Sequence, residues 1–219
     1  MNDFLRLNFP KWELLSDDEK KRIREQAVTK IYKKGDVVHR SSDDCRGILL
    51  IKKGQLRPYI MSEEGREVTL FRVRSGDVCI LTASCLMDAI TMDIMIEAIE
   101  KTEVVVVPSA ILHEVAEKHM ELELFLYKHA SEKFSDMLWL MQQILFYSAD
   151  RRVAEFLLHE ADESGEKVIC YTHEQIAKLI GSAREVVSRV LKYMEEESAI
   201  ELQRGKIVIN DTELLKKYM

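Results

Sequence analysis

The sequence predicts an α+β fold in three successive parts: short helices and strands over residues 1–112, a long helix over 113–147, and a small domain over 148–219. Turn-like clusters alternate with short apolar runs in the first part. A helical apolar period without Gly or Pro runs through the second, and two capped helices precede a hairpin pattern in the third. The 219 residues, 47% of them hydrophobic, are enough for one large or two small packed domains.

The first 28 residues are expected to form short helices. The stretch SDDEKKRI from Ser16 offers a capping side chain, then acidic and then basic residues, as a helix N-terminus favours. No secretory signal pattern occurs there, and no apolar run reaches the length of a membrane span. We therefore expect a cytoplasmic protein without a membrane partner.

Residues 29–107 have the pattern of an all-β barrel or sandwich. Five of the eight glycines lie in turn-like clusters such as KKGD and RSGD. Between the clusters stand apolar runs of strand length, GILLI, EVTLFRV and EVVVV.

The next segment is expected to form a long dimerisation helix. An apolar stripe with steps of three and four marks one face of it, at Leu122, Leu126, Ala130, Phe134, Met137, Met141 and Ile144. Other faces are apolar too, at Leu124, Leu138, Trp139, Leu140, Leu145 and Phe146. One stripe can pack on the β domain, and a second copy of the helix is the simplest cover for the remainder. Burial within a monomer is the alternative, and we favour the dimer because so long a helix outreaches a small domain.

The last part contains a helix-turn-helix pattern. Thr172 followed by Gln175 fits a capping box, and Gly181 suits the left-handed end of that helix. Ser182 followed by Glu185 fits a second capping box that opens the next helix, whose inner face we expect at Val186 or Val187, Val190 and Leu191. With the hairpin pattern AIELQRGKIVIND behind it, the unit is expected to be a winged helix-turn-helix whose second helix enters the DNA major groove. An ordinary helical hairpin is the alternative.

The outward side chains of the second helix are the candidates for reading bases. Arg can bond bidentately to guanine and Glu can accept from cytosine, so we assign this role to Arg184, Glu185, Ser188 and Arg189. Glu185 could instead only complete its capping box, and Arg184 could be a solvated charge. The candidates for phosphate contact are Thr172, His173, Lys178, Ser182, Lys192, Arg204 and Lys206.

The charge balance adds little support for DNA binding. The chain carries a net charge of −6, although Thr172–Lys192 holds four Lys/Arg against two Glu. Non-specific affinity is therefore expected to be modest and sensitive to salt.

The stretches DRRVAEFLL, YTHEQIAKLIGSAREVVSRVLKYMEEESAIEL and GKIVI closely resemble the CRP/FNR family of bacterial transcription regulators. The order of β domain, long helix and winged helix-turn-helix matches as well. The resemblance implies a homodimer with an N-terminal antiparallel, jelly-roll-like β-roll as sensor domain, which binds operator DNA and contacts RNA polymerase. Glu185, Ser188 and Arg189 match the family's Glu-x-x-Ser-Arg pattern, which implies a palindrome with TGA-core half-sites. Whether such a protein activates or represses depends on where its operator lies.

The sensor region departs from the cyclic-nucleotide pattern of the family. The positions of its Gly-Glu-Leu motif hold Ile80, Leu81 and Thr82. The position of its phosphate-binding Arg-Ser pair falls near Met92–Asp93, where a carboxylate would repel phosphate. We therefore expect no cyclic AMP binding.

Other signals stay open for this region. An iron–sulfur cluster is not expected, because no cysteine precedes Cys45. Haem binding is an alternative for this region that no distinctive ligand motif supports, and the residues indicate no metal site. The candidate effector or redox region comprises Cys79, Leu81, Thr82, Cys85 and Met92. Cys79 and Cys85 could be a redox switch, a thiolate site or part of an apolar ligand cavity, and simple core packing is the favoured alternative.

Two rival functions have weaker support. An enzyme on a β-barrel scaffold would need a metal-ligand cluster, a nucleophile–base motif or a Gly-rich phosphate loop, and the sequence shows none of these. The other rival is a dimeric scaffold that binds only protein, and a test of operator binding distinguishes it from a DNA-binding regulator.

Overall fold

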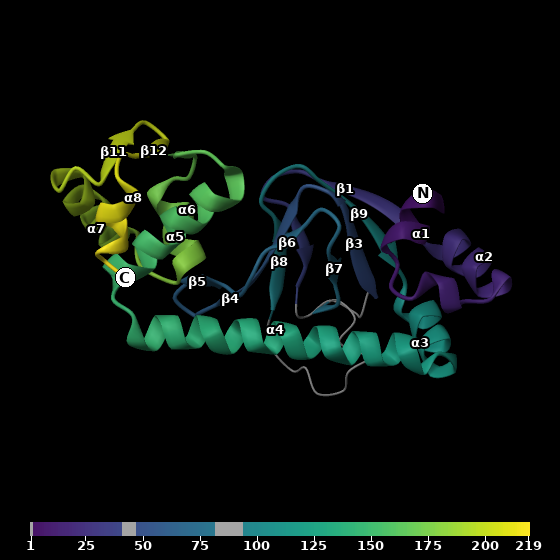
Figure 1. Ribbon diagram of the computed structural model, residues 1–219. Coiled ribbons are helices and arrows are strands. Elements are labelled where there is room, and N and C mark those ends of the chain that lie inside the picture. The colour runs from purple at the N-terminus through teal and green to yellow at the C-terminus, as the bar shows by residue number, and fades with distance from the viewer. Residues whose placement is uncertain (1, 41–46, 82–93) are drawn as a thin grey trace. The chain divides into compact units, whose positions relative to one another are not determined.

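The computed structural model describes residues 2–40, 47–81 and 94–219 (Figure 1). The chain divides into two compact units. Unit 1 comprises residues 1–61 and 70–137, and unit 2 comprises residues 62–69 and 138–219. Cys45, Thr82, Cys85 and Met92 lie outside the described residues.

Unit 1 begins with helices, as predicted. They are α1 (Asn2–Asn8), a 3-10 turn (Trp12–Leu14) and α2 (Asp17–Gln26). Ser16 caps α2 in a full capping box, since its hydroxyl accepts from the Glu19 N–H while the Glu19 carboxylate accepts from the Ser16 N–H.

The strands of unit 1 form two sheets. The first has the order β1-β9-β3-β7, with antiparallel pairing throughout. The second includes β2, β8 and β4 side by side, with β6 on β4, also antiparallel. The strand bounds are β1 Val28–Tyr32, β2 Val37–His39, β3 Ile48–Lys53, β4 Gln55–Met61, β6 Val73–Arg74, β7 Val78–Cys79, β8 Met95–Ala98 and β9 Thr102–Val107. This is the antiparallel β-roll expected from the resemblance.

Strand β3 explains why the run GILLI lacks alternation. Ile48 and Leu50 lie in one core cluster with residues of α1 and α3, because alternate side chains of a strand point to the same face. Leu49 and Ile51 point to the other face and are also buried. Both faces of the strand are therefore covered.

The long helix begins later than predicted. Residues 109–146 hold two helices, α3 (Ser109–Lys118) and α4 (Met120–Phe146), and His119 between them has an extended backbone. The His119 N–H closes the last turn of α3, and its ring Nε2 donates to Glu19 Oε2 at 3.0 Å. The helix expected over 113–147 is therefore interrupted at His119, where this long-range contact lies.

The apolar stripe predicted for α4 is buried only in its first turns. Leu122 and Leu126 are fully buried in the core, and Ala130 is half-buried against it. Phe134 and Met141, which belong to the same predicted stripe, are 60% and 56% exposed. Only the first turns of the stripe therefore pack within one chain.

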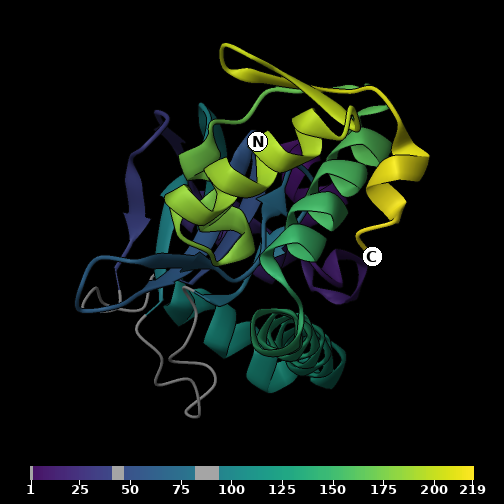
Figure 2. The ribbon, with the colours of Figure 1, turned by 90° about the vertical axis from the view of Figure 1, so that its left-hand side faces the viewer.

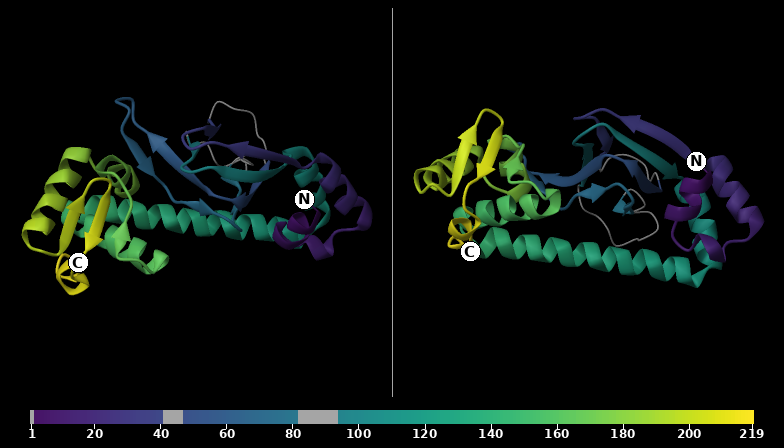
Figure 3. Two further views of the ribbon diagram at one scale, coloured as in Figure 1. Left: turned by 90° about the horizontal axis from the view of Figure 1, so that it is seen from above. Right: turned by 45° about the horizontal axis from the view of Figure 1, so that its top comes forward.

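Unit 2 contains the helix-turn-helix pattern with the predicted hairpin (Figures 2 and 3). Its three-stranded sheet has the order β10-β12-β11, and the hairpin β11–β12 turns at Arg204–Gly205. Its elements are β5 Glu67–Thr69, α5 Ala149–Ser164, β10 Val168–Ile169, α6 His173–Ile180, α7 Arg184–Glu196, β11 Ile200–Gln203, β12 Lys206–Ile209 and α8 Thr212–Lys216. Helix α8, capped by Asp211, was not predicted.

None of the described helices is long and apolar enough to cross a lipid bilayer.

Candidate nucleic-acid interface

The local sequence sets both ends of α6. Thr172 and Gln175 form the predicted capping box, in which the Thr172 hydroxyl accepts from the Gln175 N–H. Gly181 ends the helix with φ of +63°, in the left-handed region. A Cβ at Gly181 would also lie 2.9 Å from Ile144 Cδ1. The left-handed φ therefore favours glycine at this turn, and a Cβ there would also require the Ile144 side chain to shift.

The second predicted capping box, at the start of α7, is not formed. The N-cap residue is Ala183, and no side chain caps the helix. Ser182 is buried, and its N–H donates to the Ala177 carbonyl at 2.9 Å. The glycine turn holds Ser182 back from the helix, so it does not cap α7 with Glu185. Burial also leaves its hydroxyl little access to a phosphate.

Helix α7 separates an apolar face from a polar one. Val187, Val190 and Leu191 are buried in the core of unit 2, as predicted. Arg184, Glu185, Arg189 and Lys192 are exposed, and Ser188 is half-buried.

Two exposed side chains of α7 have no described partner. Within the described part of the chain, neither a hydrogen bond nor an ion pair is recorded for Glu185 or Arg189. Their polar groups are therefore free to meet an external ligand. Lys192 lies 3.9 Å from Glu196 in an exposed pair, which is weak in water.

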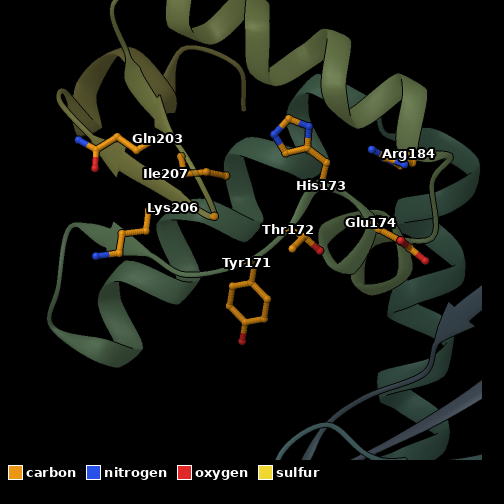
Figure 4. A pocket seen from close by; sticks show the side chains of 9 residues that line it. Tyr171, Thr172, His173, Glu174, Arg184, Gln203, Lys206 and Ile207 are labelled. Carbon is orange, nitrogen blue, oxygen red and sulfur yellow. The ribbon is translucent and has the colours of Figure 1, made fainter. Parts of the chain in front are cut away.

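A pocket of about 320 Å³ lies between the hairpin and the helix-turn-helix (Figure 4). Figure 4 shows Gln203, Lys206 and Ile207 of the hairpin at one side and His173, Glu174 and Arg184 at the other. The remaining lining residues are Tyr171, Thr172 and Gly205. His173 Nδ1 lies 2.9 Å from Ser188 Oγ, so the first residue of α6 contacts α7 directly.

The remaining candidates for phosphate contact differ in exposure and in whether they are already paired. Arg204 and Lys206 are exposed at the hairpin turn, and Thr172 is exposed at the start of α6. Lys178 is half-buried, and its Nζ lies 3.0 Å from Glu67 Oε1. Lys178 is therefore already paired.

Two arginines that bond to carbonyl groups of the α6–α7 turn were not identified from the sequence. Arg152 Nη1 donates to the Ile180 carbonyl at 2.7 Å, and Arg66 Nη2 donates to the Gly181 carbonyl at 2.6 Å. Burial, and then the charge of Arg66, lower the pKa of Arg152. These cations satisfy carbonyls at the negative end of α6. Their wide separation from the turn in the sequence gave no local signal.

The described part of the candidate effector region is apolar and buried. Cys79 and Leu81 are 2% and 7% exposed. The ring Nε2 of His129, on α4, donates to the carbonyl of Val78 at 2.9 Å. The segment next to Cys79 thus contacts the long helix.

One set of described residues has the donor types of a metal site. His159, Glu160 and Glu163 bring their ligand atoms within 4.8 Å of one another on α5. His159 Nδ1 lies 3.6 Å from Glu163 Oε2 and 3.9 Å from Glu160 Oε1. Ion pairing along one helix accounts for this proximity.

Two family models match the chain. One, described as a Crp-like helix-turn-helix domain, matches residues 151–218. The other, described as a cyclic nucleotide-binding domain, matches residues 29–119.

A solved structure from Eubacterium rectale, described as a transcriptional regulator of the crp/fnr family, is 40% identical with a TM-score of 0.90, covering 96% of this chain and 98% of that one. The transcriptional activator protein anr of Pseudomonas aeruginosa is 24% identical over 82% of this chain and 75% of its own length. The cAMP-activated global transcriptional regulator Vfr of the same organism is 22% identical over 78% of this chain and 84% of its own.

Proposed function

Because the chain belongs to the CRP/FNR family of transcription regulators, which are not enzymes, we propose that it acts as a homodimer that reads a palindromic operator with TGA-core half-sites. Glu185, Ser188 and Arg189 carry the base reading, with Arg184 beside them. Arg204 and Lys206 contact phosphate from the hairpin, and RNA polymerase is the further partner.

The exposed polar face of α7 is the observation that carries this proposal. Glu185 and Arg189 lie one turn apart, are exposed and have no partner among the described residues. Arg and Glu are the side chains that pair with guanine and cytosine edges in the major groove. The absence of a cap at α7 removes the alternative in which Glu185 only completes a capping box.

A second exposed surface supports the homodimer. Leu124, Tyr127, Phe134, Leu138, Met141 and Leu145 of α4 are each about half exposed or more. Their spacing alternates between three and four, with Ser131 filling the remaining step, which is the seam pattern of a two-helix coiled coil. We call these seven positions the α4 seam. A second copy of α4 would cover it.

The sensor proposal is that the β-roll detects a signal other than cyclic AMP. Buried, apolar Cys79 and Leu81 fit an apolar ligand cavity better than a nucleotide phosphate site. Thiol redox switching needs an accessible thiolate, so the burial of Cys79 favours packing or ligand contact over oxidation. The contact from His129 to Val78 offers a route from this segment to α4.

Selection of bound DNA from random sequence tests the operator proposal. The full chain should enrich a palindrome with half-site centres ~34 Å apart. Parallel selections with reducing agent, in air and with added cyclic AMP should differ only if one of these conditions is the signal. Recovery of no common sequence under any of them would contradict the proposal.

Arg189→Ala should abolish specific binding, because the guanidinium supplies a bidentate base contact worth ~1–3 kcal/mol at each half-site. Gel-shift titration against the selected operator measures the effect. Lys101→Ala removes the same charge from an exposed position of unit 1 and should leave binding unchanged. Undiminished binding by Arg189→Ala would refute the role.

A further inference from the structure

His173 and Ser188 belong to different helices and contact each other through side chains. His173 is the first residue of α6, and Ser188 lies fifteen residues further along the chain on α7. His173 Nδ1 lies 2.9 Å from Ser188 Oγ, a normal hydrogen-bond length. Both side chains are half-buried at the edge of the exposed α7 face.

We propose that His173 is a positioning residue for base reading: its ring fixes the Ser188 hydroxyl and thereby determines to which base edge that hydroxyl forms a hydrogen bond. The inference rests on the proposed function and replaces the phosphate contact first expected for His173. A serine hydroxyl has one donor and two acceptor sites and rotates freely when unrestrained. When an imidazole nitrogen occupies one hydrogen-bonding site of the hydroxyl, only the other sites can bond to a base in the groove.

The geometry favours positioning over phosphate contact. The Nδ1 atom of His173 is already bonded within unit 2. Lys206, an exposed cation of the pocket, is better placed to meet a phosphate, because no internal bond of its side chain is recorded among the described residues. Loss of His173 should therefore change what Ser188 selects, rather than remove a charge contact.

Three variants separate the roles of these residues. His173→Ala removes the ring, His173→Asn keeps a polar atom where Nδ1 stands, and Ser188→Ala removes the hydroxyl. Affinity is measured for the selected operator and for a panel with each base pair of the half-site replaced. We expect His173→Ala to lose about fivefold in affinity per half-site, the value of one neutral hydrogen bond.

The pattern of loss matters more than its size. His173→Ala and Ser188→Ala should relax selectivity at the same base pair, the double variant should lose no more than Ser188→Ala, and His173→Asn should restore most of the selectivity. The slope of affinity against salt should stay unchanged. A loss uniform across all sequences, with the slope reduced by about 0.9 per half-site, would identify a phosphate contact and overturn the proposal.

A measurement without DNA tests the contact itself. The ¹⁵N signal of the His173 ring should shift in Ser188→Ala and stay in place in Lys192→Ala, an exposed residue of the same helix. An unchanged signal in Ser188→Ala would overturn the proposal even if operator selection succeeds. If the wild type selects an operator and Ser188→Ala has the same base selectivity, both base reading by Ser188 and the positioning role of His173 are refuted. The proposed function is then still tested separately by Arg189→Ala.

Discussion

At the scale of single residues, Glu19 shows what local sequence predicts and what it omits. The cap at Ser16 was predicted from neighbouring residues, and the structure adds the return bond from the Ser16 N–H to Glu19. The partner that completes the site, His119, lies one hundred residues away, and its Nε2 donates to the same Oε2 atom that accepts from Ser16. No spacing rule connects them. Only the packing of α2 beside α3 brings the two residues together.

The pKa of Glu19 makes this contact testable. Burial alone would raise the pKa, but hydrogen bonds from the Ser16 N–H, the His119 ring and the Ser16 hydroxyl lower it from 4.5 to about 2. A carboxylate with a lowered folded pKa stabilises the fold above its unfolded pKa, and this stabilisation is lost as the pH falls toward the folded value. The relevant window therefore runs from about pH 4.5 down to about pH 2.

Glu19→Gln should lower the free energy of unfolding at pH 7 by on the order of 3 kcal/mol, because the neutral amide cannot reproduce the charge-assisted hydrogen bonds. Urea unfolding at a series of pH values measures the difference in the free energy of unfolding between the wild type and Glu19→Gln. This difference should become smaller below pH 4.5. Glu25→Gln, exposed on the same helix, should show little difference at any pH. If Glu19→Gln lowers the free energy of unfolding by the same amount at pH 3 and pH 7, the stabilisation does not come from the Glu19 carboxylate.

At the scale of elements, local signals predicted boundaries only where nothing distant competed. Thr172 and Gly181 bound α6 as expected, because a capping box and a left-handed glycine are local devices. The capping role of Ser182 was wrong because the N-cap of α7 is the next residue, Ala183. The interruption at His119 was missed because the neighbouring residues offer no Gly or Pro to mark it; the His119 ring contacts a residue of another helix. The exposed polar face of α7, for which base reading is proposed, was predictable from its period, whereas the His173–Ser188 contact was not.

Gly181→Ala should destabilise unit 2, since alanine pays ~1–2 kcal/mol in the left-handed region and its Cβ meets Ile144. Gly165→Ala is a matched control, because Gly165 has φ of +69° and open space around its Cβ. Thermal unfolding should show a larger loss for Gly181→Ala. Operator affinity should fall for Gly181→Ala alone, because this turn sets where α7 begins. Equal effects of the two substitutions on unfolding and binding would contradict this account of the turn.

At the scale of the whole molecule, the net charge of −6 is compatible with DNA binding only if cations are concentrated locally. The exposed cations of α7 and the hairpin of unit 2 are Arg184, Arg189, Lys192, Arg204 and Lys206. Five cations on one module give limited affinity for a single half-site. Two modules joined in one dimer raise the affinity without any new contact, because the second binding event becomes intramolecular. The proposed homodimer therefore makes the α4 seam as necessary to operator binding as α7.

Leu138→Glu places a charge at the middle of the α4 seam, where Leu138 is 48% exposed in the single chain. Burying an unpaired carboxylate against a second copy is costly, so the variant should sediment as a monomer at micromolar concentration with unchanged helical content. Its affinity for the palindrome should fall to that of the wild type for a single half-site, while base preference within the half-site persists. Ser135→Glu adds the same charge to an exposed position outside the seam and should remain dimeric. If Leu138→Glu sediments as a dimer and binds the palindrome with full affinity, the subunits meet through another surface.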